Sequence, residues 1–101
     1  MKQVNNISEE TINKIRKFFA DKPVIKAYIF GSYARNEQDD NSDIDILVEL
    51  DNAKKVGLEF IDMKLNLEDI LGIKVDMVSA GGISKHIKPY IDKDKKLIYE
   101  K

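Results

Sequence analysis

The chain contains no cysteine, and it has a single histidine among its 101 residues. Without cysteine it has neither a disulfide framework nor a thiolate nucleophile. That composition is typical of proteins in the reducing cytoplasm, where we expect this one to be found. His86 has no partner ligands with which to form a metal site, so we expect it at the surface.

Long apolar runs are also lacking. None approaches the roughly 18 residues that a membrane-spanning helix requires, and the opening MKQVNNISEET lacks the apolar segment of a signal peptide. We therefore expect no association with a membrane. A chain of this length is expected to form one domain, residues 1–101, without a separate substrate-binding domain. A large substrate then has to be met by an exposed cleft or by a partner.

A basic excess is missing as well, since the formal net charge is −1. This balance argues against nonspecific binding of nucleic acid, which requires a broad basic surface. The charge is unevenly placed, because residues 36–53 contain seven acidic side chains and no basic one. A solvated acidic face accounts for most such runs, but the spacing of these acids permits a more specific interpretation.

The pattern of apolar residues predicts alternating helices and strands in an α/β fold. Helices are expected over 8–20 with Ser8 as N-cap, over one or two turns within 32–38, over 54–72 and near Pro89, and strands over 24–30, 43–50, 73–80 and 97–100. The strand over 24–30 should be central and buried on both faces, and the strand over 97–100 should lie at an edge. Tyr28, Phe30 and Phe60 fall at spacings that favour packing in the core.

Two of the acids are separated by one residue on a predicted strand. Asp43 and Asp45 should project from the same face, with Cα atoms roughly 6–7 Å apart. Such a pair is unfavourable when empty, and a hard divalent cation such as Mg²⁺ reverses the sign of the interaction. Asp76 interrupts an otherwise apolar strand, where an unpaired carboxylate is costly, and is a natural third ligand.

The pair Gly31-Ser32 follows the predicted strand that ends at residue 30. A strand that runs into a tight turn and a helix start exposes backbone N–H groups to an anion, and glycine lets a phosphate approach the main chain. The Ser32 hydroxyl adds a donor, and Arg35 lies one turn further on, within reach of phosphate oxygens. A structural salt bridge is an equally good interpretation of Arg35. The segment lacks the glycines and lysine of a P-loop.

These residues carry a resemblance. Gly31-Ser32, ten intervening residues, Asp43-x-Asp45 and the later Asp76 resemble the signature of the DNA polymerase β-like nucleotidyltransferase superfamily. The stretches SYAR, SDIDILVE and KVDMV are similar to the minimal nucleotidyltransferases, antitoxins paired with a HEPN-domain ribonuclease toxin. The chain departs from many members at Asn36, where they have glycine.

The resemblance implies a mixed, twisted sheet flanked by helices, and an enzyme that transfers AMP from ATP to a tyrosine hydroxyl of the HEPN toxin. It implies that Asp43, Asp45 and Asp76 are catalytic and hold a pair of Mg²⁺ ions. It further implies that Gly31, Ser32 and Arg35 bind the ATP phosphates.

Two other functions fit the same residues. The chain could be a binding module that neutralises its partner by occlusion, with weak or absent chemistry. It could also transfer a nucleotide to a small molecule or to an RNA end, although enzymes of that kind usually carry extra substrate-binding domains.

Overall fold

The computed structural model describes residues 8–35, 37–39, 41–51 and 58–101. Its elements are α1 (Glu9–Phe19), β1 (Val24–Phe30), α2 (Ser32–Arg35), β2 (Ile44–Leu50), α3 (Leu58–Leu71), β3 (Val75–Ser79), the 3-10 turn η1 (Ala80–Gly82), α4 (Lys88–Asp94) and β4 (Lys96–Glu100). The expected order is confirmed, with η1 in addition. The part of the third helix expected over residues 54–57 lies outside the described residues, as does Asn36.

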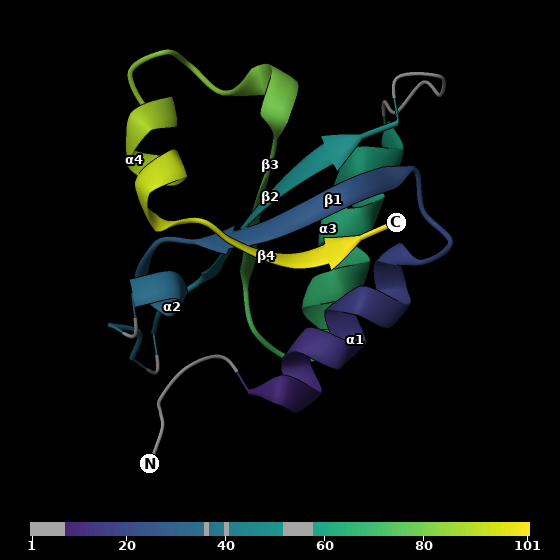
Figure 1. The fold of residues 1–101 in the computed structure, drawn as a ribbon. Coiled ribbons are helices and arrows are strands. Elements are labelled where there is room, and N and C mark those ends of the chain that lie inside the picture. The colour runs from purple at the N-terminus through teal and green to yellow at the C-terminus, as the bar shows by residue number, and fades with distance from the viewer. Residues whose placement is uncertain (1–7, 36, 40, 52–57) are drawn as a thin grey trace.

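The four strands form one mixed sheet in the order β3-β2-β1-β4 (Figure 1). β1 is antiparallel to both of its neighbours, whereas β2 and β3 are parallel. A parallel pair needs a crossover connection, and α3 supplies it. β1 is central and β4 lies at an edge, as expected.

The hydrophobic core lies between the sheet and the two longer helices, α1 and α3, which pack together in Figure 1. α1 begins where Ser8 accepts a hydrogen bond from the Thr11 N–H at 3.1 Å, which satisfies one of the free donors of its first turn. Its Phe19 side chain is fully buried, and the Phe19 and Tyr99 ring centroids are 6.0 Å apart. The largest fully buried side chains are Phe19, Ile15, Ile29, Ile44, Ile46, Met63, Leu67, Val24 and Val48.

The opposite face of the sheet is only partly covered, so the prediction that β1 is buried on both faces was wrong. Ala27 and Ile29 are buried in the core, but Tyr28, which alternates with them, is only half-buried. The Tyr28 hydroxyl donates to Glu49 Oε2 at 3.1 Å, and Lys95 Nζ lies 4.7 Å from the centre of its ring. α4 lies apart from α1 and α3 (Figure 1). Lys95 directly follows α4, and its contact with Tyr28 places the end of α4 next to this second face. Phe60 packs against the core as expected.

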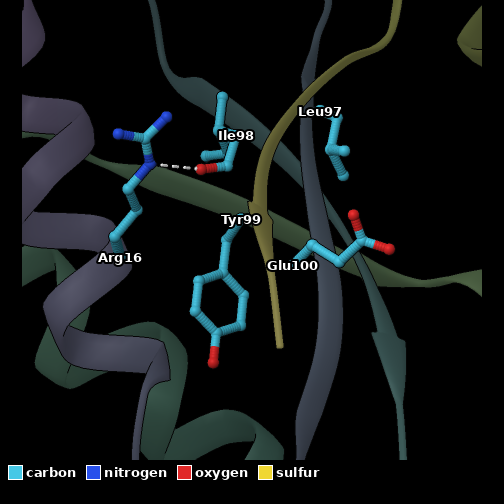
Figure 2. Close-up of a pocket in the computed structure, with 5 residues that line it drawn as sticks. All are labelled: Arg16, Leu97, Ile98, Tyr99 and Glu100. Atoms are coloured by element: carbon cyan, nitrogen blue, oxygen red, sulfur yellow. Dashed lines mark hydrogen bonds between the residues drawn. The ribbon is translucent and has the colours of Figure 1, made fainter.

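The edge strand β4 contains an irregularity that α1 stabilises. Ala27 pairs with Tyr99 and Tyr28 pairs with Leu97, which leaves Ile98 as an extra residue. Arg16 Nε donates to the Ile98 carbonyl at 2.6 Å (Figure 2). A hollow of about 390 Å³ lies here, lined by Arg16 and four residues of β4. β1 separates this hollow from the strand that carries the acidic pair.

Candidate active site

The two strand aspartates lie side by side. In the parallel pairing of β2 with β3, Asp45 is the register partner of Asp76. Register partners on neighbouring strands project from the same face of a sheet. Asp43 precedes β2 by one residue, and its negative charge reaches Asp45, so it lies near the same end of the sheet as the Asp45–Asp76 pair.

Asp45 has a perturbed carboxyl group. Its side chain is half-buried, and burial raises the pKa of its carboxyl to about 6, with the negative charges of Asp76 and then Asp43 adding to the shift. Arg35 acts in the opposite direction and is the smallest influence. Among the described residues, no ion pair or side-chain hydrogen bond neutralises any of the three carboxylates. The cluster therefore carries uncompensated negative charge.

Gly31 touches this cluster directly. Its φ of +75° is a conformation that side chains rarely adopt, and a Cβ placed there would overlap Asp45 Oδ2 and lie 3.1 Å from Asp45 Cγ. Sequence reasoning assigned Gly31 to a phosphate turn, but its contact with a carboxylate fourteen residues later was missed. The contact depends on how β1 pairs with β2, and no local pattern reports that pairing.

Ser32 opens the single helical turn α2, immediately after Gly31. The Ala34 and Arg35 N–H groups donate to the Gly31 carbonyl at 3.0 and 3.1 Å, which fixes the turn. Because Gly31 lies against Asp45, the turn that precedes α2 adjoins this carboxylate. The predicted phosphate turn and the predicted metal ligands are therefore neighbours.

Arg35 makes ion pairs. Its Nε donates to Glu37 Oε1 at 2.9 Å and its Nη1 donates to Asp94 Oδ2 at 2.5 Å. Glu37 and then Asp94 raise the pKa of the exposed guanidinium. The salt-bridge interpretation of Arg35 is thus realised, and its phosphate contact stays a prediction. Asp94 lies on α4, and its side chain is 18% exposed, against 62% for Glu37.

The acidic cluster suits a divalent cation in its chemistry. It offers carboxylate oxygens, and a bound cation would stabilise the charged form of Asp45, which burial and the neighbouring acids disfavour. No group of three or more His, Cys, Asp or Glu side chains in the described part of the chain lies close enough together to hold a metal ion as it stands. Mg²⁺ is commonly held by one or two carboxylates and by substrate phosphates, so a preformed cage is not required.

The raised pKa of Asp45 predicts a pH dependence of stability in metal-free buffer. Its folded pKa of about 6 exceeds its ordinary value of 3.8, so ionisation of Asp45 destabilises the fold fully above pH 6 and not below pH 4. Asp45→Asn should therefore be more stable than the native chain at pH 7.5, with the difference shrinking as the pH falls through that window. Urea unfolding in EDTA measures it. A native chain that is the more stable of the two at pH 7.5 would contradict the assignment.

Comparison with known proteins places this geometry in a family. Residues 13–101 match the model of the family described as polymerase beta, nucleotidyltransferase. The chain is 45% identical over 101 residues to a protein of Methanocaldococcus jannaschii provisionally named a protein adenylyltransferase, covering 98% of this chain and 99% of that protein. The chain therefore belongs to the polymerase beta nucleotidyltransferase family.

Solved structures agree with this assignment. A chain in the crystal structure of a toxin–antitoxin with AMP-PNP superposes with a TM-score of 0.77 at 27% identity, covering 89% of this chain and 73% of that one. A structure provisionally described as a minimal nucleotidyltransferase superposes with a TM-score of 0.72 at 28% identity, over 92% of this chain and 98% of that one. The fold expected from the resemblance is confirmed. No helix in the described ranges has the length and apolar character needed to span a bilayer.

Proposed function

We propose that this chain is a Mg²⁺-dependent protein adenylyltransferase, the antitoxin of a toxin–antitoxin pair, and that it transfers AMP from ATP to a tyrosine hydroxyl of a HEPN-domain toxin. The observation that carries the proposal is the pairing of Asp45 with Asp76 next to the Gly31 turn. The M. jannaschii relative, named for the same activity, supports it. So does the toxin–antitoxin structure with AMP-PNP, because its fold matches over most of this chain.

In this proposal Asp43, Asp45 and Asp76 hold a pair of Mg²⁺ ions. Bound there, the ions would supply positive charge that stabilises the triphosphate and the developing charge on the α-phosphate. Gly31 leaves room for the phosphates, and the Ser32 hydroxyl and the backbone of the turn donate hydrogen bonds to their oxygens. Asp76 accepts the proton of the acceptor hydroxyl while the hydroxyl oxygen forms its bond to the α-phosphorus. The bond from that phosphorus to the bridging oxygen breaks, and its electron pair leaves with pyrophosphate.

A labelling experiment tests the proposal. The chain, Mg²⁺ and a HEPN-domain toxin, the proposed partner, are incubated with ATP labelled on either the α- or the γ-phosphate. We expect label on the HEPN protein from α-labelled ATP only, lost when the acceptor tyrosine is changed to phenylalanine. Transfer that persists after combined Asp43→Ala and Asp45→Ala changes would exclude catalysis by these carboxylates.

Two features of the described residues favour the binding-module alternative. No three His, Cys, Asp or Glu side chains among them are grouped closely enough to hold a metal ion, and Arg35 is already paired with two carboxylates. It makes a different prediction. An Asp45→Asn variant would still protect cells from the toxin if occlusion were sufficient, whereas the enzymatic proposal requires protection to be lost. Growth with both proteins expressed separates the two.

Arg35 gives a further prediction. If its guanidinium steadies the ATP phosphates, Arg35→Ala removes a charge-assisted hydrogen bond and should raise KM for ATP about tenfold. The two ion pairs leave Nη2 available for this contact, because an arginine has five N–H donors. Initial rates at varied ATP measure it, with Lys14→Ala on α1 as a control for loss of a cation. An unchanged KM would leave Arg35 as a purely structural link between α2 and α4.

A further inference from the structure

A polar cleft includes Asp43 of the acidic cluster, whereas neither Gly31 nor Ser32 lines it. Its volume is about 500 Å³. It lies where β2 and β3 begin. Because the two strands are parallel, both begin at the same end of the sheet. Its lining residues are Asn41, Ser42, Asp43, Gly72, Ile73 and Lys74. One predicted metal ligand, Asp43, therefore forms part of its wall.

Lys74 is the cation of this cleft. The Ile44 N–H donates to the Lys74 carbonyl at 2.9 Å, and Ile44 pairs with Val75, so Lys74 stands opposite Asp43 at the start of the two strands. It directly precedes β3 and stands two residues before Asp76. Lys74 is exposed and forms no ion pair with a carboxylate among the described residues.

Two lysines at α4 differ in this respect. Lys88 Nζ lies 2.6 Å from Asp92 Oδ2, and Lys95 Nζ lies 3.0 Å from Asp92 Oδ1. Both already have a carboxylate partner within α4. Lys74, which lines the same cleft as Asp43, has no such carboxylate partner among the described residues.

The order of the strands decides which reactant reaches this cleft. Gly31 follows β1 and approaches Asp45 from that strand. Lys74 and Asp76 belong to the segment of β3, and β2 lies between β1 and β3. In phosphoryl-type transfer the attacking and leaving oxygens lie roughly in line, on opposite sides of the phosphorus. If pyrophosphate leaves toward the Gly31 turn, the acceptor hydroxyl must arrive from the β3 side.

We propose that this cleft receives the acceptor segment of the partner protein, and that Lys74 is a positioning residue that binds a carboxylate flanking the acceptor hydroxyl. This inference rests on the proposed function, since it specifies the acceptor side of the same site. Lys74 takes no part in bond making. It holds the hydroxyl over Asp76, and its charge offsets the repulsion between an acidic segment and the aspartates.

The test compares Lys74→Glu, Lys74→Ala and Lys74→Arg, with the HEPN-domain protein as acceptor. Lys74→Glu should raise KM for that protein at least about tenfold and weaken its binding in calorimetry without ATP to a similar degree. KM for ATP should stay within about twofold, and Lys74→Arg should behave as the native chain. Lys17→Glu, an exposed charge reversal on α1, is the matched control and should change neither quantity.

Two results would overturn this inference. Acceptor binding that is unaffected by Lys74→Glu would remove Lys74 from the acceptor site, and a selective rise in KM for ATP would assign it to the nucleotide instead. Failure of the proposed function looks different, because the native chain would then transfer no AMP at all. In that case the calorimetric comparison still decides whether the partner contacts this cleft.

Discussion

Asp45→Asn is expected to lower the rate of AMP transfer by at least about a thousandfold, while the protein unfolds at the same or a higher temperature at pH 7.5. Asparagine keeps the shape of the side chain but removes the charge that a metal ion needs. The fold loses nothing by the change, because Asp45 has no ion-pair partner among the described residues and its burial disfavours the charged form. Single-turnover transfer and thermal unfolding of the same preparation measure both effects.

Asp69→Asn is the matched control for this experiment. Asp69 is an exposed acid on α3, which packs on the opposite face of the sheet from the acidic cluster. The change alters the net charge equally and should leave both transfer and unfolding as in the native chain. A rate for Asp45→Asn above about a tenth of the native rate would remove this carboxylate from the chemistry.

Gly31→Ala is expected to damage stability and activity together. Alanine at a φ of +75° is strained, and its methyl group would overlap the Asp45 carboxylate, so the turn, the carboxylate or both must move. We expect a loss of about 2–4 kcal/mol in the free energy of unfolding, the upper range of single-residue backbone and steric effects. Displacement of Asp45 should also reduce transfer more than about a hundredfold.

Gly72→Ala separates the two causes. Gly72 has a φ of +69°, but an added Cβ would meet nothing within 4 Å. Its replacement should cost about 1 kcal/mol, the penalty of the conformation alone. Gly81→Ala, also in open space and without a positive φ, is the control for activity and should match the native rate. Equal destabilisation by Gly31→Ala and Gly72→Ala in chemical unfolding would show that the contact with Asp45 contributes nothing.

Local patterns were sufficient to predict the elements of this fold. Apolar periodicity predicted the helices and strands. Ser8 marked the start of α1, and Gly72 marked the end of α3. The period of two along residues 43–50 also predicted a shared face for Asp43 and Asp45. These features depend on neighbours a few residues apart, which is the range over which sequence spacing carries information.

Features that depend on distant segments were not predictable in the same way. The strand order, the register of Asp45 with Asp76 and the contact of Gly31 with Asp45 arise from tertiary pairing. The Arg35–Asp94 ion pair joins residues 59 positions apart. The expectation that β1 is buried on both faces failed because its length and apolar character do not reveal how little of the second face α4 covers.

The most direct test of the account is the position of the metal relative to Asp43, Asp45 and Asp76. Crystals grown with Mn²⁺ in place of Mg²⁺ and a non-hydrolysable ATP analogue, measured at the manganese absorption edge, give that position from anomalous scattering. The account predicts manganese peaks coordinated by these three side chains, with the triphosphate extending toward Gly31 and Ser32. Manganese bound elsewhere, or a triphosphate remote from Gly31 and Ser32, would contradict it.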